Sequence, residues 1–235
     1  MCSHYIGEQS RAKLARMGVE LSLGWQPLSE STHFFPNQMA PIIRRPPHQD
    51  AGDEAVPAME LVPANFGLLP SFAKDIKYGL RTYNARSETA ASLVSFKSAW
   101  AKGRHCIVPA SAIYEPDWRS GKHVPVKITH VDGETLGVAG LWQPWKSPAG
   151  EWMDTFAMMT INADTHEIFK ELHRPDPKRA ADRQDKRMVV ILNKDSYDAW
   201  LDAPAEQTMD FMRQCPAKRL TATPEPKEPA QKQLL

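Results

Sequence analysis

The chain has 235 residues, 42% hydrophobic and 24% charged, which fits one domain whose core is large enough to fold without disulfides or a structural metal. Its three cysteines form no Cys-x-x-Cys pair, so we expect no disulfide framework and no zinc site, and a reducing compartment. A net charge of +1 lacks the basic excess typical of nucleic-acid binders, and no apolar run reaches the ~20 residues of a membrane span.

Runs rich in β-branched residues, with apolar and polar side chains alternating, predict mostly antiparallel strands. Turn residues such as Asp132-Gly133 and Pro148-Ala149-Gly150 separate neighbouring runs. This spacing indicates hairpins that curl into a sandwich or a barrel. In chain order, the expected strands span residues 40–44, 58–62, 106–109, 112–114, 123–129, 136–143, 155–161 and 187–192.

Helical spacing of apolar residues predicts fewer and shorter helices, so the fold class is α+β. Gly18 and Gly103 follow the first two helices as candidate C-terminal caps. We expect residues 45–57 to form a polar surface loop and residues 224–235 to form a disordered tail after one domain, residues 1–223. The expected helices span residues 9–17, 87–102, 163–172, 194–202 and 204–214.

The start of the chain lacks the layout of a signal peptide, which predicts a cytoplasmic protein, and it carries a cysteine at position 2. Removal of Met1 would leave an amine and a thiol on Cys2, both partly reactive at neutral pH. The amine can form a Schiff base with an aldehyde, and the sulfur can then close a five-membered thiazolidine ring. Alternatively, the thiolate can attack an acyl carbon with the amine as base. Taken alone, a cysteine without a role explains the position more simply.

Asn84 and Arg86 precede a predicted helix that begins near Ser87, in the sequence Asn-Ala-Arg-Ser-Glu-Thr. Backbone donors at such a helix start can collect a phosphate or a carboxylate. By itself, the segment is also a plain helix cap.

Glu115 ends an apolar, β-rich segment, where partial burial would raise the pKa of its carboxyl and suit it to proton transfer. An edge-strand glutamate facing water is the alternative. His173 follows a predicted helix and can act as a proton shuttle, although most isolated histidines are exposed or structural. Residues 170–187 carry seven basic and four acidic side chains, a pattern that fits a solvated loop as well as a binding site.

Together and in this order, these motifs resemble the SOS response-associated peptidase (SRAP) family, the abasic-site processing proteins. The resemblance runs from residue 2 to about residue 223. It rests on Cys2, on residues 84–89, on Cys-Ile-Val-Pro-Ala-Ser and Tyr-Glu within 106–115, on Ala-Gly-Leu-Trp at 139–142, and on His173 with Arg-Met-Val-Val-Ile-Leu at 187–192.

The resemblance implies a single α+β domain with a central antiparallel, barrel-like β core and flanking helices. It implies binding of single-stranded DNA and a covalent thiazolidine crosslink between Cys2, freed of Met1, and an abasic-site aldehyde, with the protein at the nucleoid during DNA damage. We expect a monomer without cofactor or metal. The implied catalytic residues are Cys2, Asn84, Glu115 and His173, and the implied DNA contacts are Arg86, Asn37, Pro41, Phe66, Arg174 and Arg187.

The chemistry suggests a role for three of these groups. His173 would donate a proton to the sugar ring oxygen, which favours the open aldehyde. Glu115 would position the amine of Cys2 and move protons, and Asn84 would hold the terminus or the sugar.

The chain departs from the family pattern at several positions. His4 replaces the arginine of Met-Cys-Gly-Arg, and Phe66-Gly67-Leu68 replaces Trp-Gly-Leu. Residues 36–41 are similar to the family's Tyr-Asn-x-Ala-Pro, and the segment between His173 and Arg187 is longer and more charged than the short family form. Two other functions stay open: a cysteine-type peptidase, including an autopeptidase, that uses Cys2, and a DNA-binding module without catalysis. Lyase activity could accompany crosslinking at abasic sites.

Overall fold

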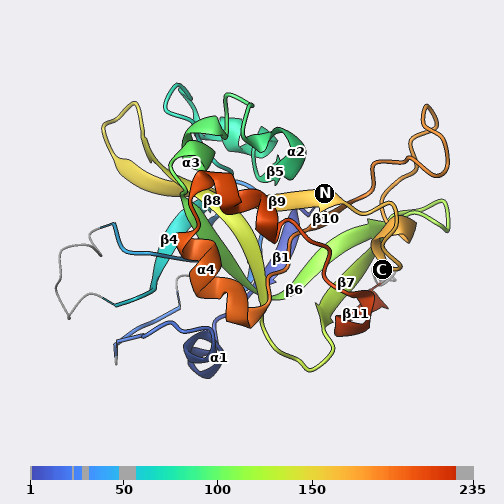
Figure 1. The fold of residues 1–235 in the computed structure, drawn as a ribbon, viewed down its shortest axis with the longest axis horizontal. Helices are drawn as coiled ribbons and strands as arrows, with labels where there is room; N and C mark the ends of the chain where they lie inside the picture. Colours follow the sequence, from blue (N-terminus) through green and yellow to red (C-terminus); the bar gives the residue numbers. More distant parts are fainter. Residues whose placement is uncertain (1, 23, 28–31, 48–56, 226–235) are drawn as a thin grey trace, which may run out of the picture.

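The computed structural model describes residues 2–22, 24–27, 32–47 and 57–225, which form strands joined by short helices (Figure 1). The α-helices are α1 (Arg11–Arg16), α2 (Ser87–Ala90), α3 (Lys97–Ala101) and α4 (Tyr197–Asp202), and 3-10 helices span Ile76–Arg81, Phe169–Glu171, Lys194–Ser196, Ala205–Phe211 and Ala217–Arg219. The strands are β1 (His4–Gly7), β2 (His33–Phe34), β3 (Met39–Arg44), β4 (Glu60–Phe66), β5 (Asn84–Arg86), β6 (His105–Asp117), β7 (Val124–His130), β8 (Leu136–Lys146), β9 (Trp152–Asn162), β10 (Arg187–Val189) and β11 (Leu220–Pro224). The predicted α+β class is confirmed.

Five of the strands close into a barrel. The strand β4 pairs with β3, β3 with β6, β6 with β8 and β8 with β9, all antiparallel, and β9 returns to β4 in a parallel pair. The predicted barrel-like core is therefore confirmed. Within this mostly antiparallel arrangement, β9 pairs in parallel with β4 and with β5.

The long strand β6 connects the barrel strands to β1 and β7 within one 11-stranded sheet. The strands expected at 106–109 and 112–114 are one continuous strand of 13 residues. Its first half pairs with β8, whereas its second half pairs with β7 on one edge and with β1 on the other. His4 of β1 lies opposite Tyr114 of β6, so the start of the chain runs beside Glu115.

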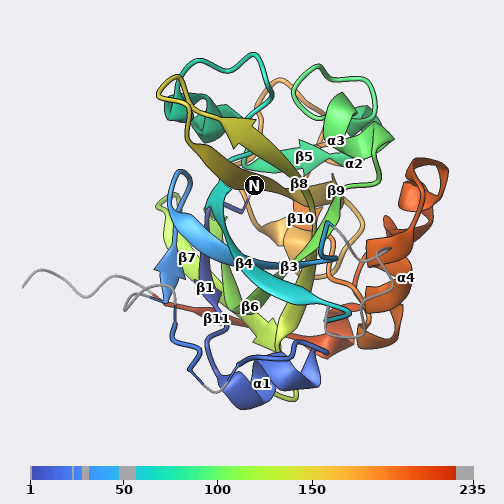
Figure 2. The same ribbon diagram turned by 90° about the vertical axis from the view of Figure 1, so that its left-hand side faces the viewer.

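The helices cover the ends and one side of the barrel. Figures 1 and 2 show α2 and α3 over one end, α1 at the opposite end and α4 along the side. The single helix expected at 87–102 is divided into α2 and α3. In the intervening turn, Ser92 Oγ donates to the carbonyl of Thr89 at 3.1 Å, and Leu93 is 48% exposed, so no apolar burial supports a continuous helix.

The other predicted helices are shorter than expected. Residues 163–172 and 204–214 contain only the 3-10 helices Phe169–Glu171 and Ala205–Phe211. The helices α1 and α4 lie within their predicted ranges, and Gly18 after α1 has a φ of +92°, which fits a C-terminal cap. Residues 48–56 of the expected surface loop, and residues 226–235 of the expected tail, lie outside the described residues.

Strands β1, β2, β5 and β11 were not predicted, because two to five residues are too few to show an alternating pattern. Tertiary packing holds β1 in place. Tyr5 is fully buried and packs edge-on against Phe66 with ring centroids 5.5 Å apart, and Phe66 stacks on Phe156 at 5.1 Å. This aromatic core therefore anchors the start of the chain against the barrel. In the described part of the chain, no helix is long and apolar enough to cross a membrane.

Candidate active site

Cys2 lies two residues before the start of β1 and is fully buried. Asn84, the first residue of β5, donates a hydrogen bond from Nδ2 to the backbone carbonyl of Cys2 at 2.8 Å. The Sγ atom of Cys2 is 3.5 Å from the carbonyl oxygen of His4. Two segments 82 residues apart in the sequence are thus joined directly at Cys2.

Glu115 and His173 form the second pair of the site. Glu115 Oε2 accepts a hydrogen bond from His173 Nε2 at 2.7 Å, and the two side chains are 0% and 14% exposed. The backbone of His173 is fixed as well: its N–H donates to the carbonyl of Pro116 at 2.7 Å, and its φ is +63°. Histidine is one of the residues that adopt this left-handed region more readily than most.

Lys186 holds the segment that carries His173. Its Nζ donates to the carbonyls of Leu172 at 2.5 Å and of His173 at 2.8 Å, and the residue is only 7% exposed. Burial lowers the pKa of the Lys186 ammonium, while Asp164 and Glu171 oppose the shift. Sequence reasoning counted Lys186 only as part of a basic run and did not identify this clamp.

The electrostatics of the site keep the Cys2 thiol protonated. Burial, followed by the Glu115 carboxylate, raises the pKa of that thiol far above its ordinary value. Tyr83, directly before Asn84, also interacts electrostatically with Cys2 and Glu115. Burial raises the pKa of the Tyr83 phenol, and these interactions with Cys2 and Glu115 raise it further. Tyr83 is therefore a residue of the site that sequence analysis missed, and its position next to Asn84 was the available signal.

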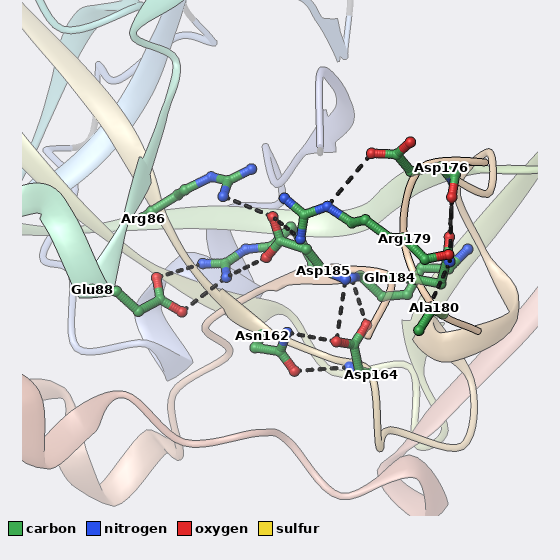
Figure 3. Close-up of polar contacts among 11 residues, drawn as sticks. Arg86, Glu88, Asn162, Asp164, Asp176, Arg179, Ala180, Gln184 and Asp185 are labelled. Atoms are coloured by element: carbon green, nitrogen blue, oxygen red, sulfur yellow. Dashed lines mark hydrogen bonds and ion pairs between the residues drawn. The ribbon is translucent and has the colours of Figure 1, made fainter. Parts of the chain in front are cut away.

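Figure 3 shows a cluster of arginines and carboxylates that includes Arg86, two residues after Asn84 in β5. Arg86 Nη1 is 2.8 Å from Asp185 Oδ2, and the Arg86 side chain is 43% exposed. Arg187 is only 4% exposed and binds both carboxylate oxygens of Glu88 at 2.8 Å, as well as the carbonyl of Thr160. Arg187 is thus a buried structural residue, which corrects its predicted place on the DNA-binding surface.

The remaining predicted DNA contacts divide by exposure. Arg174 is exposed, with its Cζ 5.4 Å from the ring centre of Trp118. Asn37 is half-buried in a turn, with a φ of +67°. Pro41, in β3, and Phe66 are buried, and the stacking of Phe66 on Phe156 leaves its ring no surface to present to DNA. The structure therefore corrects the expectation that these two side chains contact DNA from the surface.

His4, which replaces the family's arginine, is part of an aromatic stack. Its ring lies between Phe35, with centroids 4.3 Å apart, and Tyr114, at 4.1 Å, and its Nε2 is 2.7 Å from Nδ1 of His33. Burial, and then the neighbouring His33, lower the pKa of His4 to about 4. His4 is therefore neutral near pH 7 and supplies no substitute for the positive charge of an arginine.

All three cysteines are buried, and none forms a disulfide. Among the residues the structure describes, no group of three or more histidine, cysteine, aspartate or glutamate side chains is placed to hold a metal ion. The site thus consists of a thiol, an amide, a carboxylate and an imidazole from four separate segments. Such a set can bind a small polar group and transfer protons.

A family model described as SOS response associated peptidase (SRAP) matches residues 1–228. The chain belongs to the SRAP family. The family resemblance seen in the sequence is thereby confirmed.

Curated relatives are named abasic site processing proteins. YoqW of Bacillus subtilis is 29% identical over 151 residues, which cover 63% of this chain and 59% of YoqW. HMCES of Gallus gallus is 28% identical over 217 residues, covering 80% of this chain and 59% of HMCES. The matches thus span about 59% of the length of these relatives.

Solved structures share the fold. A Bordetella bronchiseptica protein is 40% identical, with a TM-score of 0.79 and coverage of 95% of this chain and 99% of that one. A Bacteroides thetaiotaomicron protein has a TM-score of 0.76 at 21% identity, with 96% and 93% coverage, and shows similarity of fold alone.

Proposed function

We propose that this protein captures abasic sites in single-stranded DNA by forming a thiazolidine between Cys2, freed of Met1, and the sugar aldehyde. The observation that carries the proposal is the meeting of Cys2 with Asn84, at 2.8 Å, beside the Glu115–His173 pair. Two further facts support it: SRAP membership, and curated relatives named for abasic-site processing. In a chain that retains Met1, the nitrogen of Cys2 is an amide and cannot form an imine.

The first step is opening of the sugar. In an abasic nucleotide the aldehyde is masked as a cyclic hemiacetal, and opening the ring requires a proton on the ring oxygen. Nε2 of His173 is committed to Glu115, while Nδ1 is buried and lacks a partner among the described residues. We assign the proton donation to Nδ1–H, with Glu115 stabilising the imidazolium through the 2.7 Å hydrogen bond.

The second step is bond formation at the aldehyde carbon. The raised pKa of the Cys2 thiol disfavours attack by a thiolate, so the amine attacks first. The amine and the aldehyde condense to an imine and release one water molecule. The S–H bond then adds across C=N: sulfur bonds to carbon, and the thiol proton ends on nitrogen. The crosslink is thus one water lighter than its two reactants, and no oxidant is needed.

Asn84 has a positioning role in this scheme. Its hydrogen bond reaches the carbonyl of Cys2, so it fixes the orientation of the residue whose amine and thiol must both reach one carbon. Arg86 lies two residues further along β5 and thus on the same face of that strand, about 6.6 Å away. This spacing suits contact with a phosphate next to the abasic sugar, and exposed Arg174 can extend the contact.

The test uses protein whose intact mass confirms loss of Met1, incubated with a single-stranded oligonucleotide that carries one abasic site. We expect a crosslink stable to denaturing electrophoresis, with a mass equal to the sum of the reactants minus one water. Cys2→Ala keeps an α-amine, so it should lose the stable crosslink yet still form a Schiff base that borohydride traps. Cys215→Ala, at another buried cysteine, serves as the matched control and should crosslink normally.

Two outcomes would overturn the proposal. One is a full yield of stable crosslink from Cys2→Ala. The other is a full yield from protein with an uncleaved N-terminal extension, in which the nitrogen of Cys2 stays an amide. Absence of any crosslink together with cleavage of peptides by the wild type, lost in Cys2→Ala, would indicate the cysteine-peptidase alternative.

A further inference from the structure

The carboxylate of Asp185 lies at the centre of three guanidinium groups (Figure 3). Its Oδ2 is 2.8 Å from Arg86 Nη1 and 3.6 Å from Arg179 Nη1, and its Oδ1 is 3.4 Å from Arg187 Nη1. Arg86 and Arg179 are 43% and 47% exposed, so both can reach a ligand from solvent. An anion site built from arginines is thus already filled by a carboxylate of the chain itself.

The charges of this cluster balance only while Asp185 is in place. Glu88 neutralises Arg187 through two hydrogen bonds, and Asp176 lies 3.5 Å from Arg179. Removal of the Asp185 carboxylate leaves one uncompensated positive charge beside Arg86. Planar guanidinium groups bind the oxygens of a phosphodiester as well as those of a carboxylate, so a backbone phosphate fits the vacated position.

The position of the cluster connects it to the proposed reaction. Arg86 shares a strand face with Asn84, whose amide holds Cys2. On the other side, Asp185 directly precedes Lys186, whose ammonium holds the carbonyl of His173. A phosphate in this site would therefore lie beside the groups that act on the sugar.

The segment that carries Asp185 is held mainly by polar contacts, among them hydrogen bonds from the backbone N–H groups of Asp185 and Lys186 to Asp164. Gln184 donates to the carbonyls of Arg179 and Ala180 and accepts from the backbone of Asp176, and most residues from 174 to 183 are exposed. The φ of Asp185 is +57°, a region in which aspartate and asparagine are tolerated. Such a segment can rearrange at lower free-energy cost than the barrel.

We propose that Asp185 is a built-in competitor for the DNA backbone: its carboxylate occupies a phosphodiester site formed by Arg86 and Arg179, and single-stranded DNA must displace it to bind. The inference rests on the proposed function and deepens it. Asp185 thereby weakens binding to any single strand, so that capture depends on additional contacts made at the abasic nucleotide.

The test compares Asp185→Asn with Asp182→Asn. Both change the net charge by +1, but the Asp182 side chain is 78% exposed and its one basic neighbour among the described residues, Arg183, is 3.9 Å away. Binding is measured by fluorescence anisotropy with an undamaged single-stranded oligonucleotide, so that no crosslink forms. We expect about tenfold tighter binding for Asp185→Asn and less than about twofold for Asp182→Asn.

A double-mutant cycle tests the mechanism itself. If Asp185 acts by occupying Arg86, then Arg86→Met should remove most of the gain that Asp185→Asn brings. Asp185→Gly, which also accepts a positive φ, replaces Asp185→Asn if thermal melting shows that the asparagine variant is unfolded. Equal gains in Asp185→Asn and Asp182→Asn, an unchanged gain in the Arg86→Met background, or weaker binding by a folded Asp185→Asn would each overturn the inference.

The outcomes also separate this inference from the proposed function. A wild-type protein that crosslinks abasic DNA while Asp185→Asn behaves like Asp182→Asn refutes only the role of Asp185. A protein that neither binds nor crosslinks in wild-type form and in the Asp185→Asn and Asp185→Gly variants refutes both.

Discussion

Replacing Glu115 by glutamine should separate acid–base chemistry from DNA binding. The amide keeps the size of the side chain and can still accept a hydrogen bond from His173, but it no longer carries a charge or takes up a proton. The Glu115 side chain is fully buried, so it offers no surface for the DNA backbone. The rate of crosslinking should therefore fall, whereas the Kd for single-stranded DNA should stay the same.

The magnitudes follow from the 2.7 Å hydrogen bond between Glu115 and His173. Loss of one acid–base group costs ~10²–10⁴ in rate, or about 3–5 kcal/mol in activation free energy. Exchanging a charged for a neutral acceptor in a buried bond lowers the free energy of unfolding by about 1–2 kcal/mol. For a domain of this size that corresponds to a Tm lower by roughly 2–8 °C, so the protein should stay folded at 25 °C.

The same change should make the Cys2 thiol more acidic, because the Glu115 carboxylate contributes to its raised pKa. The assay is single-turnover crosslinking at saturating DNA, with anisotropy for the Kd and the pH dependence of Cys2 alkylation in a Cys106→Ala/Cys215→Ala background. A mechanism in which the thiolate attacks first predicts faster crosslinking in Glu115→Gln, opposite to our expectation. Crosslinking at the wild-type rate, or a loss explained wholly by weaker binding, would refute the role of Glu115.

Three further predictions concern single residues. Asn84→Ala removes the 2.8 Å hydrogen bond to the Cys2 carbonyl, so crosslinking should slow about tenfold while the affinity for DNA stays the same. The same single-turnover assay measures the rate, and an unchanged rate would contradict the positioning role of Asn84. Arg187→Met should lower the free energy of urea unfolding by about 2–3 kcal/mol, because it breaks a buried ion pair whose acidic partner, Glu88, is half-exposed. Arg86→Met should barely change the free energy of unfolding but should reduce the slope of log K for DNA binding against log salt concentration by about 0.7. Equal effects of the two variants would contradict the division between structural and DNA-binding arginines. Burial lowers the pKa of His105 to about 4, so the unfolded chain binds a proton before the folded chain does as the pH falls below about 6.5. The free energy of unfolding should therefore fall by about 2–3 kcal/mol by pH 4.5. In urea unfolding over the same pH range, His105→Gln should lose correspondingly less stability.

Much of the fold could be predicted from local pattern. Strands β3, β7, β8 and β9 were expected close to their observed positions, because the six or more residues of each strand show an alternating or apolar pattern. The short strand β5 was missed and interpreted as a helix cap. Its three residues are strand only because β9 lies alongside and supplies the hydrogen-bonding partner, which no local pattern reports.

The candidate site could be predicted in part. Order along the chain was enough to select Cys2, Asn84, Glu115 and His173, because each has a side chain suited to proton or aldehyde chemistry and a place in a family pattern. The assignment of Arg187 to a DNA-binding surface failed for a physical reason. An arginine in a basic run faces solvent unless a carboxylate neutralises it. The carboxylate that neutralises Arg187 belongs to Glu88, 99 residues away, so the local sequence did not reveal it.

The sequence by itself therefore determined the fold class and the family, and it supplied the candidate reactive side chains of the proposed mechanism. These follow from periodicity and from residue chemistry, both of which are local. Only the tertiary structure decided which groups meet: that Glu115 bonds His173, that Phe66 is packed inside, and that Asp185 fills the position between Arg86 and Arg179. Burial, pKa and competition for a charged partner depend on distances between segments far apart in the chain, and the closure of the barrel sets those distances.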